Sequence, residues 1–582
     1  MITLLIALLF VAASKAATSG IDPIDNYCWR LYHQSTMKNG SLYIDGGIEV
    51  FTDKNSNGNP SSAPTLGYNT YLMEVDMKSS WNWQKNISIN AINKTANPST
   101  GTDPPLVVRG ALYSGASTDS SIYLYGGTNS YLNTSFPGFQ KPTSSQYALW
   151  SCDTDGDSWN QYDVTLNAPY RPAGGAYAEA PDQGLAFWLN GYIDNGTSNG
   201  LEGQSGLLRY LDGLIVIDTN KQTAKNVSTS SMDNFPRAKG GMAYISGVGS
   251  KGILVAIGGV TKPTSDGSSS NQGTYVSFNE IDFLDVASLD NGDENGSWYK
   301  QKASGDIPDG RIDFCLVTAS AKDNSSHNIY MYGGQATNKV YDQIYVLSIP
   351  SFTWTRIYEG ESPRYGHTCH LVANRQMLTV GGSSTDALTA ACDWETKGVA
   401  VYDISSLTWG STYDASASAY EVPSLVYDTV GGDANGNASM MTPSNGFSTT
   451  PIANFFQATN NSSSSSNTTS STPSKKSGIS GGAIAGAVVG SVAGAALIVA
   501  LILFIINRRR KQAATSYQQA AENKGFDSSP TGATWRNWDG QMIELPSGQS
   551  KPPAQLPDSI IPHEMEANEA PSELHSRSRA EM

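Results

Sequence analysis

The sequence has few charged residues and no excess of basic ones. Only 15% of its 582 residues are charged, and 37 lysines and arginines stand against 52 aspartates and glutamates, which gives a net charge of −15. Proteins that bind nucleic acid need a basic surface to contact the phosphates. The charge balance therefore argues against nucleic-acid binding and is typical of an acidic, well-solvated surface.

Histidine and cysteine are also scarce, with six and five residues. No Ser-His-Asp order, no phosphate-binding glycine loop and no zinc-ligand spacing stands out in the sequence. Five is an odd number, so at least one cysteine is unpaired within the chain or bonds another chain. We expect a disulfide between Cys369 and Cys392, the two closest in sequence. We predict no cofactor, no metal ion and no enzymatic activity.

What the chain does contain is a short apolar run that ends in a glycine doublet and recurs six times. The copies are Leu42–Gly47, Ile122–Gly127, Ile253–Gly259, Ile329–Gly334 and Met377–Gly382, with a weaker one, Phe187–Gly191, that has asparagine in place of the first glycine. The doublets themselves are Gly46-Gly47, Gly126-Gly127, Gly258-Gly259, Gly333-Gly334 and Gly381-Gly382. A recurrence of about 50–80 residues accommodates a four-stranded sheet with variable loops, which indicates a β-propeller.

Each doublet lies within a larger unit of four short β-type runs. An arginine precedes five of the doublets, a third apolar run follows each of them, and a tryptophan closes five of the units. The arginines are Arg109, Arg171, Arg237, Arg311 and Arg364, and the tryptophans are Trp81 or Trp83, Trp159, Trp298, Trp354 and Trp409. We expect the glycines to turn the backbone where a Cβ would clash or φ is positive, and the tryptophans to pack between sheets.

This pattern of arginine, apolar run with Gly-Gly, Tyr402-Asp403 and tryptophan resembles the kelch motif. The resemblance covers about residues 25–450 and implies an all-β fold, a galactose-oxidase-like β-propeller with six blades. Seven blades are the alternative, if an N-terminal strand or residues 420–432 complete another sheet. The whole-chain layout also resembles the kelch-repeat surface proteins of filamentous fungi.

The resemblance raises the question of a copper site built from histidines and tyrosines, as in galactose oxidase. Four histidines precede the membrane segment proposed below: His33, His327, His367 and His370. His370 follows His367 by three positions on an expected strand, so their side chains should point to opposite faces. No matching set of histidines and tyrosines is evident, and the copper site is not transferred to this chain.

Two further groups of polar residues have a functional and a structural interpretation. Asp153, Asp155 and Asp157 have the spacing of a calcium loop, but position 164 is valine where an EF-hand has glutamate, so a turn is the alternative. The repeated arginines either surround a central opening that attracts acidic ligands or sugars, or bind carbonyls and carboxylates of the next blade.

Two apolar stretches indicate a secretory, single-pass topology. Residues 1–16 have the pattern of a signal peptide, and residues 478–506 form an uncharged run long enough to span a bilayer, followed by basic residues from Arg508 on. Twelve N-glycosylation sequons precede this segment and none follows it: Asn39, Asn86, Asn93, Asn133, Asn195, Asn226, Asn295, Asn324, Asn437, Asn460, Asn461 and Asn467. The expected location is the plasma membrane, type I, with the N-terminus outside.

The expected organisation is therefore a signal peptide (1–16), a propeller (25–450), a disordered glycosylated stalk (451–477), a transmembrane helix (478–506) and a disordered cytoplasmic tail (507–582). Gly482, Gly486, Gly490 and Gly494 share one face of the helix and could pair two copies. Trp535 and Trp538 in the tail are a docking motif or part of a spacer.

We expect a non-enzymatic surface protein that binds a glycan or a protein, in cell-wall or polarity processes. The alternatives are a carbohydrate-directed oxidase of the galactose-oxidase type, and a membrane sensor that signals through its tail.

Overall fold

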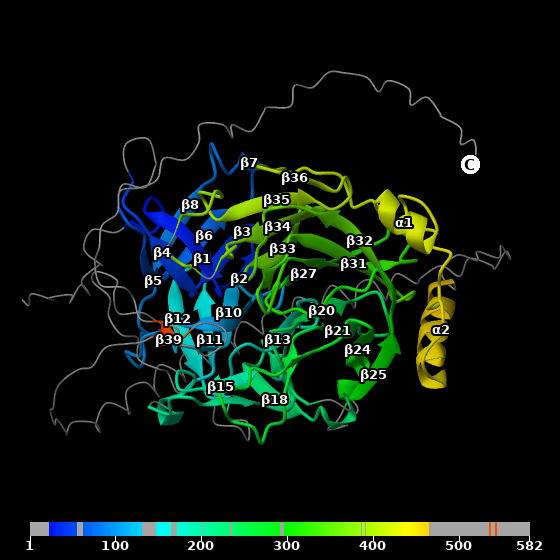
Figure 1. Cartoon of the computed structure of the whole chain (residues 1–582), viewed down its shortest axis with the longest axis horizontal. Coiled ribbons are helices and arrows are strands. Elements are labelled where there is room, and N and C mark those ends of the chain that lie inside the picture. The colour runs from blue at the N-terminus through cyan, green and yellow to red at the C-terminus, as the bar shows by residue number, and fades with distance from the viewer. Residues whose placement is uncertain are drawn as a thin grey trace, which may run out of the picture. The chain divides into compact units, whose positions relative to one another are not determined.

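A computed structural model gives the structure of the chain. It describes residues 22–54, 62–130, 147–164, 171–201, 203–232, 235–290, 296–385, 387–389 and 391–464, together with 535–536 and 542–543. Six sheets of four or five strands lie around a common centre (Figure 1). The expected all-β fold and the β-propeller are confirmed.

Within each large sheet the strands follow one another in chain order, each antiparallel to the last. Sheet 1 contains β2 (Gln34–Lys38), β3 (Ser41–Asp45), β6 (Tyr71–Asp76) and β8 (Ile89–Asn93), and sheet 2 contains β9 (Val108–Tyr113), β10 (Ser121–Thr128), β11 (Leu149–Asp153) and β12 (Ser158–Tyr162). Sheet 3 contains β13 (Ala176–Ala180), β14 (Leu185–Leu189), β17 (Leu214–Asp218) and β18 (Thr223–Val227), and sheet 4 contains β20 (Gly241–Ile245), β21 (Ile253–Ile257), β24 (Glu280–Asp285) and β25 (Ser297–Lys302). Sheet 5 contains β27 (Cys315–Ser320), β28 (His327–Tyr332), β31 (Gln343–Ile349) and β32 (Thr353–Glu359), with β26 (Ser304–Gly305) parallel to β32, and sheet 6 contains β33 (Thr368–Val372), β34 (Gln376–Val380), β35 (Val399–Asp403) and β36 (Thr408–Gly410).

Smaller sheets occupy the connections of the large ones. They are β1 (Tyr27–Leu31) with β4 (Ile48–Phe51) and β5 (Thr65–Tyr68), β15 (Tyr192–Asp194) with β16 (Leu208–Tyr210), β19 (Arg237–Ala238) with β22 (Val260–Thr261) and β23 (Thr274–Tyr275), β29 (Gln335–Ala336) with β30 (Lys339–Val340), and β7 (Trp81–Asn82) with β37 (Thr412–Tyr413). The helical elements are η1 (Asn199–Leu201), η2 (Ser230–Met232), η3 (Val286–Asp290), α1 (Ser424–Val430) and α2 (Thr450–Ser464). In a separate C-terminal unit, residues 534–582, β38 (Trp535–Arg536) pairs with β39 (Met542–Ile543).

The glycine doublets tie each large sheet to the next. In all six units the second glycine has a positive φ and its N–H donates to a carbonyl in the segment that leads into the following sheet. The pairs are Gly47–Val107 (3.0 Å), Gly127–Pro172 (2.7 Å), Gly191–Arg237 (3.0 Å), Gly259–Arg311 (3.3 Å), Gly334–Arg364 (2.8 Å) and Gly382–Arg30 (2.6 Å). The last pair joins sheet 6 to sheet 1, so the series closes on itself.

A second closed series of backbone hydrogen bonds lies at the start of the first strands, one residue from each unit. Each N–H donates to the carbonyl of the preceding member, over 2.7–3.0 Å, in the order Tyr32, Arg109, Gly174, Lys239, Asp313, Gly366 and back to Tyr32. All six residues have positive φ, between 56° and 68°. Four of them are not glycine, a conformation that costs on the order of 1 kcal/mol per residue. We call these six residues the axial ring.

The tryptophans that close the units pack between the sheets, as expected. Trp159 and Trp354, on the fourth strands β12 and β32, are fully buried, and Trp81, Trp83 and Trp298 are at least 90% buried. Each joins a hydrophobic cluster with residues of other strands. Removing such a side chain costs about 3–5 kcal/mol, so these residues hold neighbouring sheets together.

The disulfides differ from the expected pairing. Cys28 bonds Cys392, which links the N-terminal strand β1 to the β34–β35 connection, and Cys315 bonds Cys369, which links the first strands of sheets 5 and 6. The predicted Cys369–Cys392 bridge is therefore wrong: closeness in sequence was a poor guide, because the ring brings distant segments together. Cys152 is the free cysteine among the described residues, and it is buried.

The segment after the last sheet folds back over the outer strands. Residues 420–432 contain α1 (Ser424–Val430), which packs on sheet 5, so they add no strand to a seventh sheet. The first part of the expected disordered stalk is helix α2, whose Ile452 and Phe456 are 1% and 2% exposed in the cluster around Phe283 and Phe352. The apolar face of α2 extends the ordered domain beyond residue 450.

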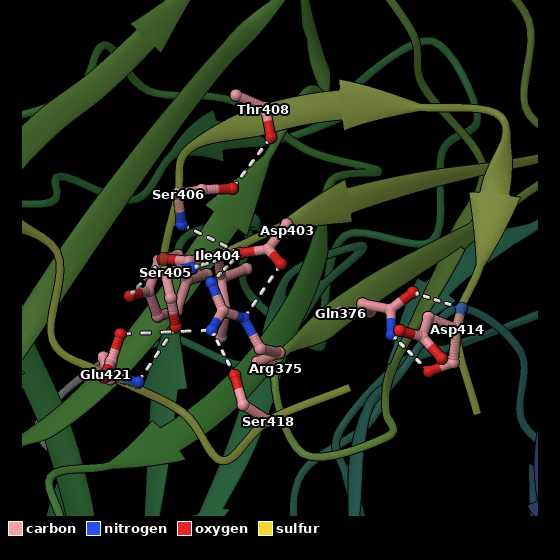
Figure 2. A network of polar contacts seen from close by, with 11 residues as sticks. Arg375, Gln376, Asp403, Ile404, Ser405, Ser406, Thr408, Asp414, Ser418 and Glu421 are labelled. Atoms are coloured by element: carbon pink, nitrogen blue, oxygen red, sulfur yellow. Dashed lines mark hydrogen bonds and ion pairs between the residues drawn. The ribbon is translucent and has the colours of Figure 1, made fainter. Parts of the chain in front are cut away.

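Figure 2 shows how this segment is fixed at sheet 6. The Arg375 guanidinium donates to both carboxylate oxygens of Asp403, over 2.8 and 2.9 Å, and to the Ser418 hydroxyl over 2.7 Å. Nearby, Gln376 and Asp414 exchange two hydrogen bonds. These contacts hold the chain where it leaves the last sheet.

The signal peptide, the transmembrane segment with its glycine face, Trp538 and most of the tail lie outside the described residues. Among the residues that are described, no helix has both the length and the apolar character needed to cross a membrane.

We predict that the last doublet tolerates no side chain. A Cβ at Gly381 would lie 2.5 Å from the Arg30 carbonyl oxygen, whereas at Gly101, which has a similar φ, nothing lies within 4 Å. Gly101→Ala should cost about 1 kcal/mol of unfolding free energy through φ alone, and Gly381→Ala about 3 kcal/mol or more. Urea unfolding of both variants measures this. An equal loss of unfolding free energy in the two variants would contradict the close contact between sheets 6 and 1 at Gly381.

Candidate binding face

The arginines of the repeat are buried and hold the glycine doublets in place. Arg364 donates to the Gly381 carbonyl over 2.8 Å and to both oxygens of Asp393, and Arg311 donates to the Gly333 carbonyl over 3.3 Å. Arg171 donates to the Gly127 carbonyl over 3.0 Å, and burial lowers its pKa to about 10. The structural interpretation holds for these residues, except that most of their partners belong to their own unit and not to the next.

Two positions depart from the predicted arginine series. Arg30, which the sequence analysis did not include, occupies the place of Arg364 in the first unit and forms a two-point ion pair with the buried Glu49. Arg109 is instead a member of the axial ring, and Val107 takes the repeat position in its unit. Arg30 precedes Gly46 by 16 residues and Arg364 precedes Gly381 by 17, so the spacing could have identified it.

Arg109 crosses the centre of the axial ring. Its guanidinium pairs with Asp313, the ring member three places away in either direction, and lies 3.7 Å above the Tyr32 ring. Gln335 donates to the same carboxylate over 2.8 Å. The side chains of the ion pair are each 4% exposed, so the pair is buried where it spans the axial ring.

The electrostatics of the axial ring follow from burial and this pairing. Burial alone would raise the pKa of Asp313, but the charge and hydrogen bonds of Arg109, with Lys239 and Gln335, hold it below its usual range. Burial lowers the pKa of Lys239 to about 7, with Arg109 adding to the effect. The axial ring therefore contains the charged pair of Arg109 and Asp313, and a lysine, Lys239, whose pKa is lowered to about 7.

Two of the histidines share one hydrogen-bonded network between sheets 1 and 6. His33 Nε2 lies 3.0 Å from the Thr368 hydroxyl, His370 Nε2 lies 2.7 Å from the Ser35 hydroxyl, and these two hydroxyls bond each other. His327 is the first residue of β28. His367 packs against Tyr332, on the opposite side from His370. Burial lowers the pKa of His367 to about 3 and that of His370 to about 4.

One group of potential metal ligands occurs among the described residues. Ligand atoms of Cys315, His367 and Cys369 lie within 4.8 Å of one another, but the two sulfurs are joined in the disulfide. Asp153, Asp155 and Asp157, the residues with calcium-loop spacing, lie at the β11–β12 hairpin turn. Asp153 accepts hydrogen bonds there from Ser120 and from the Asp155 N–H. These contacts are those of a turn, the second of the two interpretations.

The connections between second and third strands carry a side chain that the repeat pattern did not single out. Trp394, in the β34–β35 connection, is 58% exposed. The segment that carries it is anchored on both sides, because Cys392 is bonded to Cys28, and Asp393 and Glu395 pair with Arg364. Trp394 is thus an exposed aromatic side chain on a rigid support. In the sequence, Trp394 could have been noticed because it stands between Asp393 and Glu395, two residues after Cys392, and not at the position of a closing tryptophan.

The sequons occupy other parts of the surface. Asn39, Asn86, Asn93, Asn226, Asn324 and Asn437 are exposed. They lie in the turns after first strands, on or beside fourth strands, and after α1. Asn195 is the described sequon in a connection between second and third strands, and it is half-buried. Asn133, Asn295 and Asn467, and the side chains of Asn460 and Asn461, lie outside the described part. We call the surface formed by the second-to-third-strand connections and the segments before the first strands the loop face.

Comparisons with known proteins agree with the repeat. The family model described as the KLHDC2/KLHL20/DRC7 Kelch-repeats domain matches residues 267–424. A protein of Arthroderma benhamiae named "Kelch repeat-containing protein" is 29% identical over 489 residues, which cover 73% of this chain and 66% of that relative's length. A solved structure, "Structure of YjhT", is 16% identical with a TM-score of 0.41 and covers 66% of this chain and 97% of its own.

We predict that the ion pair between Arg109 and Asp313 makes the free energy of unfolding depend on pH in the acidic range. Asp313→Asn suits the positive φ of this position and leaves Arg109 buried without its counter-charge, which should cost about 3–5 kcal/mol at neutral pH. Because the pKa of Asp313 is lowered in the folded state, the pair stabilises above the usual carboxyl pKa, and its contribution disappears as the pH falls through the lowered one.

Urea unfolding from pH 7 downward, compared between wild type and variant, measures the difference. Asp218→Asn, which removes an exposed pair with Lys221, is the control and should change little. A difference between wild type and Asp313→Asn that stays constant down to the most acidic pH would contradict the role of the ion pair.

Proposed function

We propose that this chain, whose repeat matches kelch-repeat proteins, has a six-bladed propeller that serves as the binding module of a non-enzymatic cell-surface protein. The loop face is the surface that would contact the partner, an extracellular protein or a glycan. Residues 478–506 would anchor the propeller in the plasma membrane, with the basic residues from Arg508 on the cytoplasmic side.

Trp394 is the observation that carries this proposal. Residues that dominate binding energies are often tryptophans, held in place before the partner arrives. The disulfide at Cys392 and the two acidic neighbours paired with Arg364 limit the freedom that Trp394 would lose on binding. A side chain of this size, left 58% exposed on an anchored segment, suits a contact site better than a core role.

The sequons support the same face. A glycan is bulky and well hydrated, so an N-glycosylated asparagine keeps its surroundings free of protein partners. The exposed described sequons lie off the second-to-third-strand connections, with Asn93 and Asn226 near the ends of fourth strands. If they are glycosylated, they would leave those connections accessible.

A role in cell-wall or polarity processes would follow from such an anchored binding module. The oxidase alternative has no particular observation in its favour among the described residues, because His33 and His370 bond the Thr368 and Ser35 hydroxyls and His367 packs on Tyr332. Copper analysis and a peroxide-release assay on sugars would test it.

We predict that Trp394→Ala weakens partner binding about tenfold or more and costs only about 1 kcal/mol of stability, since the side chain is 58% exposed and loses an edge-to-face contact with Trp83. Leu425→Ala on α1, where the residue is 45% exposed, is the control. A glycan array with the full-length chain, and photo-crosslinking on intact cells from positions 394 and 425, identify the partner and measure the effect.

We expect crosslinks from position 394 and not from 425, and we expect excess wild-type chain to compete them away while excess Trp394→Ala does not. No bound glycan and no crosslink from position 394, or equal binding by wild type and Trp394→Ala, would contradict the proposal.

A further inference from the structure

A pocket of about 450 Å³ lies on the side of sheet 4, where helix α2 begins. It is lined by Ser231 and Met232 of η2, Asp282 of β24, Trp298, Tyr299 and Lys300 of β25, and Thr449, Pro451 and Ile452 at the start of α2. Ligand pockets of proteins have volumes of about 300–1,000 Å³, so this one is large enough for a small molecule. Three segments far apart in sequence build it: η2, the β24–β25 hairpin and the start of α2.

The walls of the pocket are held in place by the core. Ile452 and Phe456 of α2 are buried in the cluster that contains Phe283 and Phe352, and the Phe283 and Phe456 ring centroids are 5.7 Å apart. On the same stretch of chain, the Ser448 N–H donates to Gln301 on β25 over 2.8 Å. The start of α2 therefore cannot swing away from β25 without breaking packed contacts, and the pocket is a fixed feature of the fold.

Positive charge outweighs negative charge around the pocket. Asp282, 3% exposed, is paired with the buried Arg237, and the Lys300 ammonium lies 3.9 Å from the other carboxylate oxygen. Two cations thus share one carboxylate. Arg237 already neutralises Asp282 at short range, which leaves much of the Lys300 charge available to a second anion.

Hydrogen-bond donors are also in excess. The first turn of a helix has N–H groups without partners inside the helix and the positive end of the helix dipole, and here Ile452 belongs to that turn. The indole Nε1 of Trp298, a residue 8% exposed, is buried and has no hydrogen-bond partner among the described residues. Ser231 and Thr449 add hydroxyl groups that can donate or accept.

The remaining lining is apolar and partly aromatic. Met232, Trp298, Tyr299, Pro451 and Ile452 provide it. Aromatic and aliphatic walls with a few charged and hydroxyl groups favour a ligand that has a hydrophobic face, several hydroxyls and one negative charge. A six-membered sugar ring with a carboxylate has these three properties.

We propose that this pocket binds an acidic sugar, a uronic-acid unit, with its carboxylate at Lys300 and the first turn of α2 and its ring against Trp298 and Tyr299. The site lies apart from Trp394 and does not depend on the partner of the loop face. It gives the surface a second, small-ligand specificity for acidic polysaccharide.

Titration of the full-length chain with D-glucuronate, followed by calorimetry and by saturation-transfer NMR, tests the proposal. We expect saturable binding in the millimolar range, no measurable binding of D-glucose, which lacks the carboxylate, and none of cyclohexanecarboxylate, which lacks the hydroxyls. Lys300→Ala should weaken glucuronate binding about tenfold or more, because it removes a charged hydrogen bond. Lys221→Ala, which removes the same charge from an exposed turn, should leave binding unchanged.

Thermal unfolding separates a binding effect from misfolding, since Lys300 is partly exposed and its removal should not change the midpoint. Trp394→Ala should bind glucuronate like wild type, so failure at the loop face and failure at this pocket give different results. The proposal is overturned if glucuronate does not bind, if glucose or cyclohexanecarboxylate binds as well as glucuronate, or if Lys300→Ala binds like wild type.

Discussion

The hydrogen bond from the second glycine of each doublet to the next unit is the interaction on which the fold depends. A four-stranded sheet leaves both faces uncovered, and it becomes stable only when neighbouring sheets pack on it. The doublet brings the backbones of two units within hydrogen-bond distance, where a Cβ would collide with a carbonyl, as at Gly381 and Arg30. Six such joints close a ring, and the buried Arg171, Arg311 and Arg364 bind doublet carbonyls beside them.

Closure of the ring is reinforced from several directions. The bond from Gly382 to Arg30, the Cys28–Cys392 disulfide and the pairing of β37 with β7 all connect the last unit with the first. The axial ring adds a continuous series of peptide hydrogen bonds at the centre, and Arg109 and Asp313 pair across it. Because these contacts fix the sheets, their connections can carry exposed side chains such as Trp394 on a rigid base.

The repeat made the fold predictable, because the same local requirement appears six times. The doublets, Arg237, Arg311, Arg364 and the closing tryptophans have the positions that the spacing indicated, although the arginines bind mostly within their own units and Pro172, not Arg171, supplies the joint carbonyl. Features that occur once were harder to foresee. The disulfides depend on which segments the ring brings together, and helix α2 depends on a hydrophobic stripe that includes Ile452 and Phe456 in a segment rich in serine, threonine and asparagine. Arg109 looked like a repeat arginine, yet it occupies the axial ring, since only the three-dimensional register distinguishes the two positions.

The most direct test of the closed ring is hydrogen–deuterium exchange of the peptides that carry the second glycines: Gly47, Gly127, Gly191, Gly259, Gly334 and Gly382. If the six joints form one cooperative unit, their amides exchange only when the whole domain unfolds, together and at the slowest rate in the chain. Exchange at Gly382 or Gly47 as fast as in exposed turns, while the other joints stay protected, would show that the ring is open between the last and first sheets and would contradict the account.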